Sequence, residues 1–61
     1  MKNIEEKILD LINNSDGLTI GDVARILNIH RITASKYLAV LEAKNKIRYR
    51  AVGKAKLYFS R

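Results

Sequence analysis

Apolar residues recur at helical spacing in three segments of the chain. The pattern predicts helices at about 4–13, at roughly 20–27 and from Arg31 to about Lys44. Thr19 is expected to cap the second helix, because its hydroxyl can accept a hydrogen bond from a free backbone N–H at the start of that helix. Asn28 suits the short left-handed turn that leads into the third helix.

After residue 46 the apolar period changes to two, which predicts a β-hairpin over 47–60 with Gly53 in its turn. An extended segment at Leu18 would add a short third strand. These elements together predict one α+β domain over residues 1–61, mainly α with a small two- or three-stranded antiparallel hairpin. The domain is either complete in itself or a fragment of a longer protein.

The register of the hairpin depends on the length of its turn. A two-residue turn would place Leu57 and Phe59 on the face of the arginines, whereas a three-residue turn would place them on the face of Ile47 and Tyr49. Because a slip of one residue moves every side chain to the other face, the three-residue turn is expected. The outer face is then expected to carry four polar-tipped residues, namely Arg48, Arg50, Lys56 and Tyr58, with Lys54 at the tip.

The chain has 61 residues and no cysteine, so we expect neither disulfides nor thiolate metal sites. No apolar run approaches the length of a membrane span, and a cytoplasmic protein without membrane association is expected. The net charge is +6 and is unevenly distributed. Residues 1–29 hold three basic and five acidic residues, while residues 30–61 hold nine basic and one acidic. A basic half of this kind favours a polyanionic partner.

The order of elements, with the segments "LTIGDVARILNIHRITASKYLAVLEAKNKI" and "YRAVGKAKLYF", resembles the winged helix-turn-helix transcription regulators. The resemblance covers about residues 4–60. The second segment is similar to the wing of the ArsR- and MarR-like groups, and "ASKYLAVLEA" is most similar to archaeal members. Three positions depart from the family pattern: Asn28 and Asn45 stand where Gly is frequent, and Ala34 stands where Val or Ile is usual.

The resemblance implies that the chain binds double-stranded DNA and regulates transcription, with the third helix in the major groove and the wing on the adjacent backbone or minor groove. Family members commonly dimerise through flanking helices that this chain does not show. A homodimer, or further domains of a longer chain, is therefore expected.

Helical geometry adds candidate contacts within the third helix. When Ala34, Leu38 and Leu41 face inward, Ile32 and Lys36 point outward with Thr33 and Ser35 on either side. Lysine can donate to guanine, hydroxyls can serve several bases, and an apolar side chain can touch a thymine methyl. The candidate DNA-binding residues are His30, Arg31, Ile32, Thr33, Ser35, Lys36, Arg48, Arg50, Lys54 and Lys56.

Alternatives remain for some of these residues and for the domain as a whole. His30 can serve as a helix cap or a DNA contact, and a metal site is disfavoured because it is the single histidine. Arg48, Arg50 and Lys56 can be a merely solvated strand face. The domain can also be a protein-interaction module without DNA binding, or an RNA-binding part of an assembly. No catalytic constellation is visible in the sequence, so neither an enzyme nor a cofactor is expected.

Overall fold

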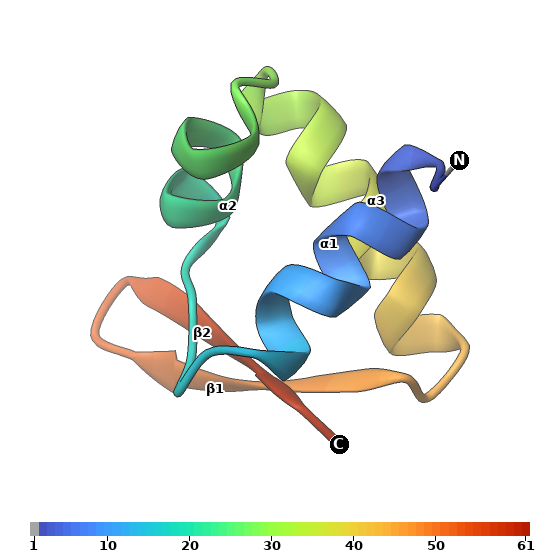
Figure 1. Ribbon diagram of the computed structural model, residues 1–61. Helices are drawn as coiled ribbons and strands as arrows, with labels where there is room; N and C mark the ends of the chain where they lie inside the picture. The colour runs from blue at the N-terminus through green and yellow to red at the C-terminus, as the bar shows by residue number, and fades with distance from the viewer. Residues whose placement is uncertain (1) are drawn as a thin grey trace.

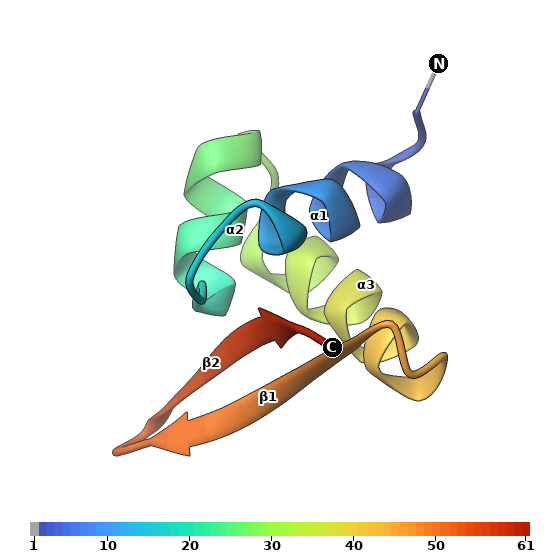
Figure 2. The ribbon, with the colours of Figure 1, turned by 60° about the horizontal axis from the view of Figure 1, so that its bottom comes forward.

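The computed structural model describes residues 2–61 and places three helices over a β-hairpin (Figure 1). The elements are α1 (Ile4–Asn13), α2 (Ile20–Leu27), α3 (Arg31–Ala43), β1 (Ile47–Val52) and β2 (Ala55–Ser60). All three helices have the bounds expected from the sequence to within one residue. The tip of the hairpin projects beyond the helices, as Figure 2 shows.

Local side-chain chemistry fixes where α2 begins and ends. The Thr19 side chain accepts a hydrogen bond from the Asp22 backbone N–H at 3.1 Å, and the Asp22 carboxylate accepts one from the Thr19 backbone N–H at 3.2 Å. This reciprocal pair is a capping box. Asn28 ends the helix in the left-handed conformation, with φ at 55°. A tight left-handed turn therefore joins α2 to α3.

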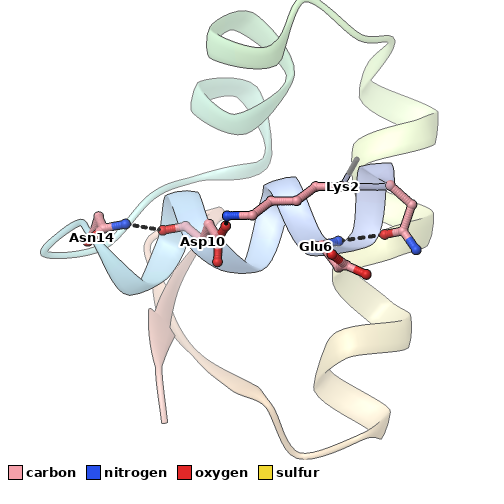
Figure 3. Close-up of polar contacts among 5 residues, drawn as sticks. Lys2, Glu6, Asp10 and Asn14 are labelled. Atoms are coloured by element: carbon pink, nitrogen blue, oxygen red, sulfur yellow. Dashed lines mark hydrogen bonds and ion pairs between the residues drawn. The ribbon is translucent and has the colours of Figure 1, made fainter.

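Polar side chains in α1 and in the residues that flank it form hydrogen bonds and an ion pair along the helix (Figure 3). Asn3 accepts a hydrogen bond from the Glu6 backbone N–H at 2.8 Å, and Asn14 donates its side-chain N–H to the Asp10 carbonyl at 2.8 Å. Lys2 forms an ion pair with the Asp10 carboxylate. These groups are exposed, so the ion pair contributes only about 0–1 kcal/mol to stability.

The hairpin differs from the register expected from the sequence. Val52 pairs with Ala55, so the turn contains the two residues Gly53 and Lys54 rather than three. Gly53 has φ at 61°, the arrangement that a glycine at the first position of a type II′ turn provides. The prediction of a three-residue turn was wrong, and one face of the hairpin carries both the arginines and the pair Leu57 and Phe59.

The loop before α2 explains this register. Leu18 forms an isolated antiparallel bridge with Tyr58, so it acts as a third, one-residue strand beside β2. Gly17 lies against the outer face of the sheet, where an added Cβ would be 3.1 Å from both Leu57 Cγ and Phe59 Cε1. The loop thus shelters the two apolar residues on the outer face, and the same register turns Tyr58 inward against the helices.

The core lies between the helices and the inner face of the hairpin. The core residues come from every helix and from both strands. They are Ile8, Ile12, Val23, Ala24, Ala34, Leu38, Leu41, Ile47 and Tyr58. Leu38 and Leu41 of α3 are fully buried, so α3 is anchored by its second half. Within residues 2–61, no helix has the length and apolar character needed to cross a membrane.

Candidate nucleic-acid interface

The N-terminal half of α3 presents a solvent-exposed face. Ala34, on the inner side, is fully buried, whereas Ile32 has 73% of its surface exposed. Ser35 and Lys36 are also exposed, and Thr33 is half-buried at the margin. This is the orientation expected from helical geometry, and it leaves one side of the helix free to contact another molecule.

His30 and Arg31 stand at the start of this helix. His30 is the N-cap, and its Nδ1 atom accepts a hydrogen bond from the Ile32 backbone N–H at 3.1 Å. The cap role expected from the sequence is therefore present, and the imidazole remains exposed. Arg31 is exposed as well, beside the beginning of α2.

A hollow of about 460 Å³ connects α2, α3 and the tip of the hairpin. Three cationic side chains line it: Arg31 from α3, Lys54 from the turn and Lys56 from β2. The first residues of α2 also line it, at the end of the helix where the backbone dipole is positive. We name this set of residues the tip hollow; its lining is Thr19, Ile20, Gly21, Arg31, Lys54, Ala55 and Lys56.

Arg48 and Arg50 lie on the other face of the hairpin. Their cross-strand neighbours are Phe59 and Leu57, and the Arg48 guanidinium carbon lies 6.0 Å from the centre of the Phe59 ring. The two arginines and Phe59 line a separate hollow of about 320 Å³. The structure therefore divides the basic residues predicted for the wing into two groups on opposite faces.

Lys56 and Tyr58 do not share the outer face that the sequence suggested for them. Lys56 lies on the inner side of the sheet, where its Nζ atom is 4.5 Å from the centre of the Tyr49 ring. Tyr58 is only 4% exposed, and burial raises the pKa of its hydroxyl above the usual 10.0, with smaller contributions from Glu42 and Tyr49. The interpretation of Tyr58 as an outward contact was wrong.

Three of the acidic side chains form ion pairs with basic residues outside the candidate DNA-binding set. Glu5 binds Lys44 at 2.9 Å and Asp22 binds Arg25 at 3.1 Å, while Asp10 binds Lys2. Among residues 2–61, no ion pair involves a candidate DNA-contacting cation, a group comprising Arg31, Lys36, Arg48, Arg50, Lys54 and Lys56. These cations are therefore available to an external anion.

The first turn of α2 is the part of the tip hollow that the sequence analysis missed. The capping box at Thr19 and Asp22 locates the beginning of this helix, but no local signal places it beside the wing. Its position depends on the bridge between Leu18 and Tyr58, which is a contact across 40 residues.

An exposed helix after a tight turn, flanked by a two-stranded wing, defines the winged helix-turn-helix class. The chain belongs to the family described as "Bacterial protein of unknown function (DUF977)", whose model matches residues 1–59. No curated protein sequence matches the chain.

Two solved structures share the fold. Reduced HlyU from Vibrio cholerae N16961 superimposes with a TM-score of 0.87 at 19% identity, over 97% of this chain and 61% of HlyU. NolR from Sinorhizobium fredii superimposes with a TM-score of 0.84 at 24% identity, over 98% of this chain and 60% of NolR. The chain thus spans about three fifths of the length of either structure, and the match confirms three helices with a two-stranded antiparallel hairpin.

Proposed function

We propose that this chain binds double-stranded DNA specifically and serves transcription regulation. The observation that carries the proposal is the gathering of unpaired cations around the exposed half of α3 and the tip of the wing. Three acidic side chains are held in ion pairs with Lys2, Arg25 and Lys44, and five of the six acidic residues lie within residues 1–29. Cations arranged around a protruding helix match the phosphate backbones that border a groove.

In this proposal the first half of α3 enters the major groove. A helix fits that groove, and helix-turn-helix proteins contact base edges through the beginning of the recognition helix. Lys36 can donate to guanine O6 or N7, and the hydroxyls of Thr33 and Ser35 can donate or accept. His30 and Arg31 stand beside the first turn, where the sugar–phosphate backbone passes.

The tip hollow would receive a backbone phosphate. Lys54, Lys56 and Arg31 supply charge, and the start of α2 adds oriented N–H dipoles. Arg48 and Arg50 face away from this hollow, so we assign them a longer-range part: they strengthen the positive field or contact DNA that continues past the wing.

The wing sequence favours an ArsR- or MarR-like regulator that acts in the cytoplasm without a cofactor or a catalytic step. HlyU and NolR each extend well beyond the part that this chain matches. A homodimer, or additional segments of a longer chain, would join two such domains for binding to paired half-sites. The similarity to archaeal members stays a prediction, since the matching family is described as bacterial.

Fluorescence anisotropy with a selected duplex and a random duplex, at several salt concentrations, tests the proposal. Lys36→Ala should weaken binding to the selected duplex more than to the random one, because a base contact is worth about 1–3 kcal/mol of discrimination. Lys54→Ala should weaken both duplexes alike and reduce the salt dependence, because phosphate contacts carry no sequence information.

The outcome of the same titrations separates the alternatives. Equal effects of the two substitutions on both duplexes would remove the base-reading role of α3. Absence of salt-dependent binding to any duplex would instead favour a protein-interaction module. A competition between duplex DNA and duplex RNA distinguishes the remaining nucleic-acid alternative.

A further inference from the structure

Ile32 is the most exposed large apolar residue of the structure over residues 2–61. Its exposed fraction is 73%, against 54% for Val52, 51% for Ile26 and 42% for Tyr49. It lies in the first turn of α3, on the face opposite the buried Ala34 and Leu38. Its side chain contributes little to the core, so its chemistry is available to a partner of α3.

The neighbours of Ile32 restrict what that partner surface can be. Ser35 and Lys36 lie one turn further along the same exposed face, followed by exposed Ala39. The alanine adds no bulk, so a flat or concave partner can approach the helix closely. Lys36 has no acidic partner in residues 2–61; its Nζ atom lies 5.7 Å from the centre of the Tyr37 ring.

The major groove of DNA presents one exposed methyl group that an aliphatic side chain can contact, the C5 methyl of thymine. We propose that Ile32 is a specificity-determining residue that reads a thymine methyl, and that Lys36 reads a guanine close to it. This inference rests on the proposed DNA binding and deepens it, because it states which base pairs α3 selects. Burial of Ile32 against the methyl removes apolar surface of both partners from water.

The spacing of the two residues sets the spacing of the two bases. Ile32 and Lys36 are four residues apart, which is about 6 Å along the helix axis. A helix in the major groove lies at an angle to the DNA axis, and residues three or four apart on such a helix contact successive bases, so the thymine and the guanine should lie in neighbouring base pairs. A half-site that contains these two base pairs as neighbours is therefore the expected target of α3.

Nucleobase analogues test the thymine contact. A duplex is first selected from a random library with the wild-type protein, and each thymidine is then replaced in turn by deoxyuridine, which lacks only the C5 methyl. One such replacement within the contact region of α3 should raise the Kd about fourfold, the factor that corresponds to burial of one methyl-sized group. For Ile32→Ala, the thymidine and deoxyuridine duplexes should bind with equal Kd.

Ile26→Ala is the matched control, because it removes the same atoms from an exposed isoleucine of α2. It should retain the fourfold difference between the two duplexes. The inference is overturned if no deoxyuridine replacement changes the Kd of the wild-type protein, or if Ile32→Ala still distinguishes the duplexes. A double-mutant comparison of this kind isolates the contact itself.

A second substitution tests the guanine. Replacing the guanine of the base pair next to the sensitive thymine by 7-deazaguanine removes its N7 acceptor. The wild-type protein should bind that duplex more weakly, and Lys36→Ala should not distinguish it from the parent duplex. Insensitivity of the wild-type protein to this replacement would overturn the assignment of Lys36 to the N7 atom of that guanine.

These results are distinguishable from failure of the proposed function. Salt-dependent, selective binding that ignores both analogues would overturn the Ile32 and Lys36 assignments and leave DNA binding intact. No salt-dependent binding to any duplex would overturn the proposed function, and the base assignments with it.

Discussion

Tyr58 is the aromatic residue that ties the hairpin to the helices. It is 4% exposed, and its backbone exchanges two hydrogen bonds with Leu18, of 2.9 and 2.7 Å. Its ring centre lies 6.0 Å from that of Tyr49. Burial disfavours the charged phenolate, so the pKa of Tyr58 is raised, and the negative charge of Glu42 raises it further.

This environment of Tyr58 predicts that the folded protein loses stability at alkaline pH. Between the usual pKa of 10.0 and the raised pKa of Tyr58, the folded protein holds a proton that the unfolded chain releases. The free energy of unfolding should therefore fall as pH rises through that window. Urea unfolding from about pH 9 to about pH 11, which brackets the ordinary tyrosine range, measures it.

Tyr58→Phe provides the comparison, because it keeps the ring and removes the ionising group. Its free energy of unfolding should fall less steeply with pH than that of the wild type. Lysines titrate in the same range in both proteins, so only the difference between the two slopes is informative. Parallel slopes would contradict the effect assigned to Tyr58.

At the scale of elements, the loop between α1 and α2 controls the position of the hairpin. Gly17 has φ at 133°, and a Cβ there would meet Leu57 and Phe59 at 3.1 Å. Gly17→Ala should lower the free energy of unfolding by about 1–3 kcal/mol, through backbone strain and the close contacts. Chemical denaturation measures this loss of stability, provided that the m-value is the same for the variant and the wild type.

Gly21→Ala is the matched substitution within α2. The nearest atom to its Cβ would be Thr19 Oγ1, at an ordinary 3.8 Å. Alanine should stabilise the helix here by up to about 1 kcal/mol, because glycine has the lower helix propensity. If Gly17→Ala proved as harmless as Gly21→Ala, the loop would not be the element that holds the hairpin in register.

The helices could be predicted from the sequence because their signals are local. The Thr19 and Asp22 capping box, the left-handed Asn28 and the apolar period each act within a few residues. The hairpin register could not be obtained in the same way. Its apolar pattern suited a three-residue turn, and only contacts with Gly17 and Leu18, far away in the sequence, make the two-residue turn favourable.

Over the whole molecule, the position of residues in the sequence and the formation of ion pairs both separate positive from negative charge. Ion pairs join Lys2, Arg25 and Lys44 to acidic residues from the first half of the chain. The membership of the basic surface could be predicted from the sequence. Its division into the tip hollow and the opposite face with Arg48 and Arg50 could not, because that division follows the hairpin register.

This division predicts unequal electrostatic roles. The double substitution Lys54→Ala/Lys56→Ala should make the negative slope of log K against log salt shallower by about 1.8, since each phosphate contact contributes about −0.9. Arg48→Ala/Arg50→Ala removes the same charge from the other face and should change the slope less. Anisotropy titrations on one duplex over a range of salt concentrations measure both slopes.

Lys2→Ala/Lys7→Ala is the control for net charge, because it removes two cations from the α1 end of the chain. It should leave the slope of the wild type nearly unchanged. If all three double variants had the same slope, binding would depend on overall charge and not on the geometry of the wing.

The cap at the beginning of α3 also fixes the tautomer of His30. Its Nδ1 atom accepts the Ile32 N–H, so in the neutral ring the hydrogen resides on Nε2. His30 is exposed, so this second nitrogen is left as a donor at the surface of the protein. One side chain thus closes the first turn of α3 with one nitrogen and offers an N–H group to an acceptor outside the protein with the other.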